Sequence, residues 1–258
     1  MKTIVRNDIS DWIFGGMIFA KVSVHIRFLI PIAIQILIYG CAIYHPQSTD
    51  IPLIDHKGEL RIDAGASIIP SVYSTVSYGL TNRISFMTFA SAGLEERYYF
   101  QFSPGFYKTL QNNNVIELYG GYGFGHAKIV KNPIANIPER VEQSLAGNYQ
   151  LYFAQLNWGK NTSSSKVFEW AIGLKTGLFH SILTDRNYYR IYPESEPFPT
   201  NKENSILIEP MFVFRIGNDK VKFTNKISFT KIFKLNNPEN TIPIPIVNFG
   251  LGINLKLK

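Results

Sequence analysis

The stretch VNFGLGINLKL, residues 247–257, decides the fold of this chain. Every second residue from Val247 to Leu257 has a large apolar side chain, whereas the residues between them are Asn, Gly or Lys. Because successive side chains of a β-strand point to opposite faces, this stretch predicts a strand with one wholly apolar face. A helix would scatter the same residues around its circumference.

The same alternation recurs along most of the chain after residue 57. It is clear in residues 60–68, 83–92, 168–178, 206–216 and 220–229, and weaker in residues 70–80, 97–110, 113–129 and 144–160. We therefore expect about ten long strands. They would place roughly 60% of this region in strands, well above the 20–25% of ordinary globular proteins.

Long alternating strands fit two kinds of barrel, which differ in the face that carries the apolar side chains. A lipocalin-like soluble barrel buries this face, whereas a transmembrane barrel turns it to lipid. The polar face combines glycines with charges of both signs, such as Glu169 with Lys175 and Glu209 with Arg215, which suits a crowded polar lumen. The lumen charges that we expect are Arg61, Asp63, Glu169, Lys175, Glu209 and Arg215.

Aromatic residues and loop lengths both favour the transmembrane barrel. The aromatic residues gather near the ends of predicted strands, as girdles at membrane interfaces do, for example at Tyr98-Tyr99, Trp158, Trp170 and Tyr188-Tyr189. Short turns fall at one end of the strands, and three long loops fall at the other end, at about 130–143, 183–204 and 233–244. We predict an all-β fold, an antiparallel transmembrane β-barrel of about ten strands over residues 58–258, with both barrel termini in the periplasm.

The first forty residues resemble an export signal. The apolar run 28–39 follows two basic residues, Lys21 and Arg27. It is shorter than the roughly 20 apolar residues that a membrane-spanning helix needs, but it fits the apolar part of a signal peptide. We predict a signal peptide over residues 1–40. If the chain started at Met17 instead of Met1, the signal peptide would have a more ordinary length.

The lone cysteine follows this run directly. Ile38-Tyr39-Gly40-Cys41 resembles a bacterial lipobox, in which the chain is cleaved before a cysteine that becomes acylated. We expect lipidation at Cys41 and a lipidated periplasmic spacer over residues 41–57, where Pro46 and Pro52 discourage regular structure. The acyl chains would then lie in the inner leaflet of the outer membrane. A single cysteine excludes both a disulfide framework and a Cys-based zinc site.

Two motifs extend this interpretation to a family. HKGELRIDAG (His56 to Gly65) and STVSYGLTNRISF (Ser74 to Phe86) resemble uncharacterised outer-membrane β-barrel lipoproteins of Bacteroidota. In that family a KGE motif opens the first strand, and a hairpin with a Tyr and a Thr at this spacing joins the second and third strands. The resemblance implies the barrel and the lipid anchor but no activity.

The charge of the chain allows two interpretations of the lumen. The 258 residues include 26 Lys+Arg and 19 Asp+Glu, a net charge of +7. The basic residues alternate into strands instead of forming one basic face, so we expect no nucleic-acid partner. The lumen charges would make either a narrow anion-preferring channel or a charge-paired, sealed interior, because ten strands are far fewer than the 16–18 of open porins.

Weak candidates for catalysis lie near the predicted outer ends of two strands. A lipid-modifying hydrolase would need His126 or His180 beside a nucleophile such as Ser181 or Ser103. The glycine-rich run 120–125 is superficially similar to a phosphate loop, but no helical pattern follows it, so we interpret it as a tightly curved strand. The other histidines are dispersed, and we expect neither a metal nor a cofactor.

The sequence thus predicts a lipid-anchored β-barrel in the outer membrane of a Gram-negative bacterium, with a structural or surface-interaction role. Its partners would be the outer-membrane bilayer, the barrel-assembly and lipoprotein-export machineries, and a surface ligand at the three long loops. Three alternatives stay open at this point. They are an outer-membrane lipid-modifying hydrolase, a narrow anion-preferring channel and a soluble lipocalin-like periplasmic lipoprotein.

Overall fold

The computed structural model describes residue 44 and residues 51–94, 96–131, 143–161, 168–186, 200–235 and 247–257. The predicted signal peptide and Cys41 lie outside these residues. Within the described ranges no helix combines the length and the apolar character that crossing a membrane requires.

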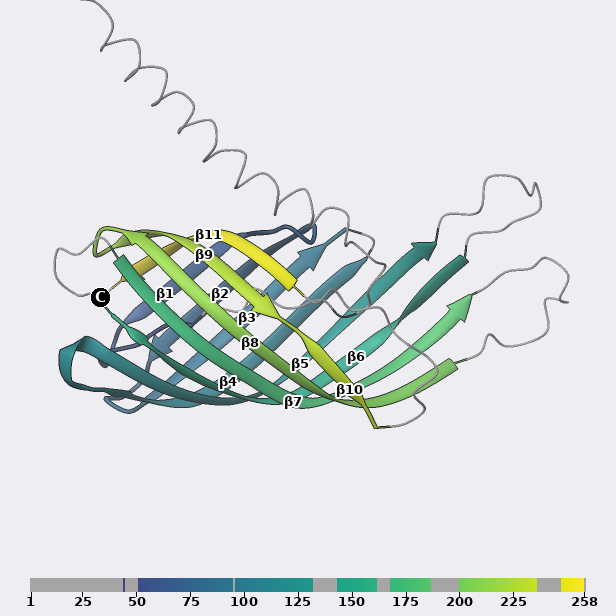
Figure 1. Ribbon diagram of the computed structural model, residues 1–258, viewed down its shortest axis with the longest axis horizontal. Helices are drawn as coiled ribbons and strands as arrows, with labels where there is room; N and C mark the ends of the chain where they lie inside the picture. The colour runs from purple at the N-terminus through teal and green to yellow at the C-terminus, as the bar shows by residue number, and fades with distance from the viewer. Residues whose placement is uncertain are drawn as a thin grey trace, which may run out of the picture. The chain divides into compact units, whose positions relative to one another are not determined.

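Antiparallel strands make up most of the described structure (Figure 1). A short 3-10 turn, η1 (Gln111–Asn113), separates β4 from β5. The strands are β1 (Leu60–Ser67), β2 (Ser71–Gly79), β3 (Ile84–Gly93), β4 (Arg97–Thr109), β5 (Asn114–Lys131), β6 (Gln143–Lys160), β7 (Phe168–Arg186), β8 (Thr200–Gly217), β9 (Val221–Phe229), β10 (Lys231–Lys234) and β11 (Val247–Leu257).

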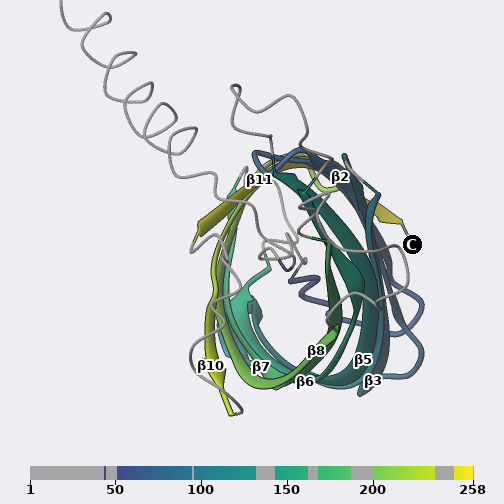
Figure 2. The ribbon, with the colours of Figure 1, turned by 90° about the vertical axis from the view of Figure 1, so that its right-hand side faces the viewer.

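The sheet closes on itself into a barrel of ten strands. Neighbours in the chain pair with each other from β1 to β8, and β1 also pairs with β11 along its whole length. Two segments, β9 and β10, follow one another directly and both pair with β8, so they fill one position in the wall. Figure 2, turned by 90° from Figure 1, shows the strands curving around a common interior. The predicted antiparallel barrel of about ten strands is confirmed.

The two ends of the barrel differ in their connections. At the short-turn end lie the turns 80–83, 110–113 and 218–220, together with the end of β11. At the long-loop end lie the turn 68–70 and the short connection between β3 and β4, and the other strands there are joined through residues 132–142, 187–199 and 236–246. Each of these three stretches falls within, or close to, one of the predicted long loops.

The outer face of the strands carries large apolar side chains, whereas the inner face carries polar side chains together with two groups of aromatic and aliphatic ones. In β11, Leu251 and Ile253 are 52% and 54% exposed, whereas Asn248 and Asn254 are each 2% exposed. The outward positions of β4 to β8 carry the same kind of exposed residue, including Phe102, Leu118 and Leu178. A soluble lipocalin-like barrel would have the opposite arrangement, so that alternative is wrong.

A row of polar side chains limits the apolar outer surface toward the long-loop end. Cross-strand neighbours build this outer polar row, which consists of Tyr98, His126, Asn148, Gln150, His180 and Asn204. On β5 the outward residues between Asn114 and His126 include no charged side chain. At about 3.3 Å per residue and a tilt of about 40°, this distance corresponds to a height of about 30 Å, close to the apolar band of outer-membrane barrels.

The glycine-rich run 120–125 lies within β5, as predicted, and makes room for aromatic rings inside the barrel. A Cβ on Gly123 would lie 2.1 Å from the hydroxyl of Tyr99, and one on Gly125 would lie 2.4 Å from the ring of Tyr149. Glycine on this strand therefore lets two large side chains cross the interior.

The orientation of β11 gives a first prediction. In a Cys41→Ser background, a fluorophore on Leu251→Cys should be quenched by brominated lipid chains in reconstituted bilayers, because this side chain points out of the barrel. The matched control, Asn254→Cys, points into the lumen and should stay unquenched. Equal quenching at the two positions would contradict the assignment of the outer face.

Candidate functional site

The lumen is the candidate functional site, and its short-turn half is built around one buried carboxylate. Glu169 Oε1 accepts hydrogen bonds from Arg61 Nη1 at 2.7 Å and from Arg215 Nη1 at 2.5 Å. Its second oxygen accepts a hydrogen bond from the ammonium group of Lys222. The side chains of all four residues are at most 4% exposed. Because a buried ion needs an oppositely charged partner, loss of Glu169 would leave the buried cations around it unpaired.

A second carboxylate extends the network to the seam between the first and last strands. Glu59 Oε1 accepts from Arg61 Nε at 2.6 Å and from Lys256 Nζ at 3.1 Å. On the same side of the lumen, Asp63 pairs with Lys226. Residues from β1, β7, β8, β9 and β11 thereby become linked through charges inside the barrel.

All six predicted lumen charges are buried in the interior: Arg61, Asp63, Glu169, Lys175, Glu209 and Arg215. Their partners differ from the expected ones, because Glu169 lies opposite Arg215, and Lys175 lies opposite Glu209, on the neighbouring strand. The lumen charges of the described residues nearly balance, with six buried carboxylates against five buried cations. These are Glu59, Asp63, Glu117, Glu169, Glu203 and Glu209, against Arg61, Lys175, Arg215, Lys222 and Lys226. This balance gives no preference for anions.

The lumen also contains part of the chain itself. We call Tyr44 together with Ile51–Asp55 the lumen segment. Three of its side chains, Ile51, Leu53 and Ile54, are fully buried. The first two pack against inward-facing apolar residues of the wall, namely Val115, Ala171, Met211 and Val213. Complete burial of one such side chain contributes about 1.5–3 kcal/mol, so this packing holds the segment in place. The predicted spacer is irregular in its described part, as expected, but it lies inside the barrel.

Hydrogen bonds fix the backbone of the lumen segment to the same charged wall. Arg215 Nη2 donates to the carbonyl of Ile51 at 2.6 Å, in addition to its bond with Glu169. The backbone N–H of Ile54 donates to Glu117 Oε1 at 2.8 Å. Irregular backbone inside a barrel needs such partners, because each unpaired buried group is costly.

In the long-loop half of the lumen, aromatic rings enclose the other described part of the segment. The ring of Tyr44 is fully buried and makes edge-on contacts with three rings, those of Tyr99, Tyr149 and Phe179, at centroid distances of 6.5, 5.7 and 5.2 Å. Its hydroxyl donates to Glu209 Oε2 at 3.1 Å. The lumen is therefore filled at both levels by the chain's own side chains.

Lys175 lies in the same aromatic region and is fully buried. Its ammonium group donates to Gln101 Oε1 at 2.7 Å and lies 4.5 Å from the ring centroid of Phe153. Hydrogen bonding and cation–π contact thus replace the hydration of this charge.

The sequence interpretation missed the lumen segment and its aromatic surroundings. One available signal was the apolar run Ile51-Pro52-Leu53-Ile54 inside the expected spacer. Another was the set of aromatic residues at inward positions, such as Tyr99, Tyr149 and Phe179, which a purely polar lumen would not contain.

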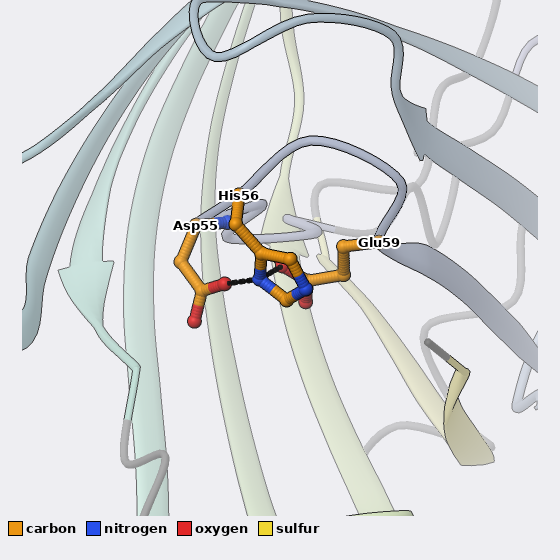
Figure 3. A group of neighbouring side chains, drawn as sticks. All are labelled: Asp55, His56 and Glu59. Atoms are coloured by element: carbon orange, nitrogen blue, oxygen red, sulfur yellow. Dashed lines mark hydrogen bonds and ion pairs between the residues drawn. The ribbon is translucent and has the colours of Figure 1, made fainter.

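Asp55, His56 and Glu59 form the one group of described residues with the spacing of a metal site (Figure 3). Nδ1 of His56 contacts Asp55 Oδ1 and lies 3.3 Å from Glu59 Oε2. The carboxylate oxygens already have partners, however. Lys256 Nζ lies 3.1 Å from both Asp55 Oδ2 and Glu59 Oε1, and the backbone N–H of Asp55 donates to Glu59 Oε2. Because a cation would have to displace the ammonium group of Lys256, these residues fit a metal poorly.

The charges of this group instead hold the end of the lumen segment to the last strand, through the ammonium group of Lys256. Burial would raise the pKa of Asp55, but its hydrogen bonds with Glu59 and His56 and the charge of Lys256 outweigh this effect and hold that pKa well below its usual range. Asp55 is therefore ionised at neutral pH. Its ion pair with Lys256 links the chain just before β1 to β11.

The catalytic candidates do not come together. His126 and His180 face outward, near the long-loop ends of β5 and β7, as predicted, and they contact Asn148 at 2.8 Å and Asn204 at 2.6 Å. Ser181 and Ser103 are fully buried and face the lumen, and the hydroxyl of Ser103 donates to the carbonyl of Met87. The barrel wall therefore separates each histidine from both serines.

The central carboxylate gives a second prediction. Glu169→Gln should lower the free energy of unfolding by about 3–5 kcal/mol, because it leaves buried cations without their counter-charge. Urea titration of the refolded barrel measures this change. Glu96→Gln, whose side chain is 68% exposed and forms only a 3.5 Å pair with Lys128, is the control and should change stability by less than about 1 kcal/mol. A mild effect of Glu169→Gln would mean that the cluster is hydrated.

Comparison with known proteins identifies the fold of this chain but no activity. No family model matches the chain, and no curated protein matches it. The chain is similar in structure to the outer membrane protease OmpT from Escherichia coli, with a TM-score of 0.53, 8% identity and coverage of 78% of this chain and 93% of that one. The β-barrel domain of Pseudomonas aeruginosa OprF (TM-score 0.32, 10% identity, coverage of 78% and 98%) and the KdgM porin in complex with oligogalacturonate (0.36, 9%, 78% and 99%) are more distant. The chain thus has the fold of an outer-membrane β-barrel.

Proposed function

We propose that this chain is a sealed, lipid-anchored outer-membrane β-barrel, which holds its long loops at the membrane surface for a structural or recognition role. The outward apolar face and the barrel fold support residence in the outer membrane. The polar outer row supports a membrane boundary near the long-loop end. Residues 130–143, 183–204 and 233–244 would then be the surface for a ligand.

One observation carries the proposal: the lumen segment and the paired charges fill the interior. Ions passing through the barrel would have to displace Tyr44 from its aromatic surroundings and Ile51 from its bond with Arg215. The near balance of buried charges offers no selective path either. These features support a closed barrel over the narrow anion-preferring channel, and the separation of histidines from serines gives no support to the hydrolase.

The lipid anchor of the proposal rests on sequence features. Cys41 follows a signal-like apolar run and is the only cysteine of the chain. Two or more acyl chains on one residue suffice for stable anchoring. The two motifs at 56–65 and 74–86 also support a lipoprotein of the Bacteroidota type, exported and inserted by the lipoprotein and barrel-assembly machineries.

Conductance tests the seal. In planar bilayers the wild-type barrel should show no resolved conductance steps, whereas deletion of residues 43–54 should produce small discrete steps, because it removes all of the lumen segment except Asp55. A deletion of equal length within the outer loops, residues 187–198, is the control and should stay closed. Large steady conductance of the wild-type barrel would contradict the proposed function.

Metabolic labelling tests the anchor. Wild-type chain expressed in a Gram-negative host should incorporate labelled palmitate, and Cys41→Ser should not, because this change removes the thiol that carries the acyl group. Equal barrel yield in the heat-modifiability assay on gels serves as the control for folding. Label on Cys41→Ser would show that acylation occurs at another residue and would contradict the proposed anchor.

A further inference from the structure

The ring of Tyr44 marks the level of the lumen segment near the long-loop end. Its partners Tyr99, Tyr149 and Phe179 are each the sequence neighbour of a residue in the outer polar row, namely Tyr98, Asn148 and His180. Tyr99 is also only two residues from the start of β4 at the long-loop end. Tyr44 therefore lies inside the lumen at the height where the apolar outer surface ends.

The other part of the lumen segment lies at the short-turn end. Leu53 accepts a hydrogen bond at its carbonyl from Asn161, which directly follows β6. The carbonyl of Asp55 accepts one from Thr109, the last residue of β4. Ile51 lies slightly higher, near Asn157, because both its Cδ1 and the Asn157 side chain lie within 3 Å of a Cβ built on Gly173.

The chain between these two levels has little slack. From Tyr149 to Asn157 is eight residues of β6, or about 20 Å along the barrel axis at 3.3 Å per residue and a tilt of about 40°. The seven residues from Tyr44 to Ile51 span at most about 25 Å when fully extended. Both ends of this stretch are anchored, and its greatest possible length only slightly exceeds the distance between the two levels.

We infer that the chain enters the lumen from the long-loop end and leaves it at the short-turn end, where β1 begins. This inference rests on the proposed membrane barrel and deepens it. Cys41 precedes Tyr44 by three residues, a reach of at most about 11 Å. The short-turn end is about 20 Å away along the axis, so the thiol cannot reach the membrane leaflet there while Tyr44 keeps its position. Acyl chains on Cys41 would enter the leaflet at the long-loop end, opposite to the sequence expectation of an inner-leaflet anchor.

The contacts of the segment favour this direction as a fixed feature of the fold. Tyr44 is bound at one level through Glu209, whose Oε2 also accepts from Thr230, and Ile51 and Ile54 are bound at the other level through Arg215 and Glu117. Glu209 and Arg215 lie six residues apart on β8, and Glu117 lies on β5, so these anchors hold the segment at two points along the axis. A spacer outside the barrel would have none of these partners.

Sidedness of a cysteine label tests the inference. Ala42→Cys in a Cys41→Ser background places a thiol next to the lumen segment without a lipid. Two reference variants in the same background mark the ends. Thr200→Cys lies at the exposed start of β8 at the long-loop end, and Asp219→Cys lies in the exposed turn at the short-turn end. All are reconstituted in vesicles with a predominant orientation and treated with a membrane-impermeant maleimide.

We expect the labelled fraction of Ala42→Cys to match that of Thr200→Cys and to differ from that of Asp219→Cys. Ile43→Cys provides a second reporter, so the test survives if one variant fails to fold on heat-modifiability gels. The inference would be overturned if the labelled fractions of Ala42→Cys and Ile43→Cys matched that of Asp219→Cys, or if both reporters were labelled only in detergent. Neither result would contradict the membrane barrel itself. If Thr200→Cys and Asp219→Cys label alike in oriented vesicles, the proposed membrane function fails, and the inference fails with it. Because all variants lack Cys41, an absence of lipidation does not affect the outcome.

Discussion

Every group that faces the inside of a closed barrel must find its partner inside. A wall of ten strands has too narrow a lumen for bulk water to solvate each charge, so carboxylates and cations have to neutralise one another across it. Glu169 meets this requirement by binding cations from three other strands. The remaining volume is filled by aromatic rings and by the chain that precedes β1. The lumen thus acts as the core of this protein, and the outer surface carries the apolar residues that a soluble protein would bury.

The wall was predictable because its pattern is local. An alternation such as that of residues 247–257 assigns each side chain to a face before any strand partner is known, and antiparallel pairing of neighbours then follows from the short turns. The charge partners were less predictable. Glu169 and Lys175 share a face of one strand, but the charged groups meet across strands, so the register had to be known before Arg61 and Arg215 could be assigned to Glu169.

The lumen segment could not be found in this way. Residues 44–56 have no period, and their prolines are compatible with a spacer outside the barrel as well as with an irregular path inside it. Their contacts are also distant in sequence, because Tyr44 reaches Glu209 and Ile51 reaches Arg215. Only the closed wall shows that the inward rings of Tyr99, Tyr149 and Phe179 leave a space for one more ring.

The two histidines on the outer face, His126 and His180, contribute to the surface of the wall and not to its interior. His126 and His180 form part of a polar row that separates apolar side chains from the long-loop rim, and their asparagine partners satisfy one ring nitrogen each. Polar and aromatic side chains at this height are amphipathic groups at a boundary between two solvents. In the proposed membrane barrel, these side chains would fix the depth of the barrel in the bilayer.

The position of Lys256 bears on the order in which this barrel can assemble. Its ammonium group joins β11 to Asp55 and Glu59, so the last strand, the first strand and the base of the lumen segment are fastened together at one place. Once the seam is shut, the segment could reach its position only by passing end-on through a packed interior. Laid against the concave face of a sheet that is still open, it needs no such passage. Assembly would then be simplest if β11 docked on β1 last and wrapped the wall around a chain already in place.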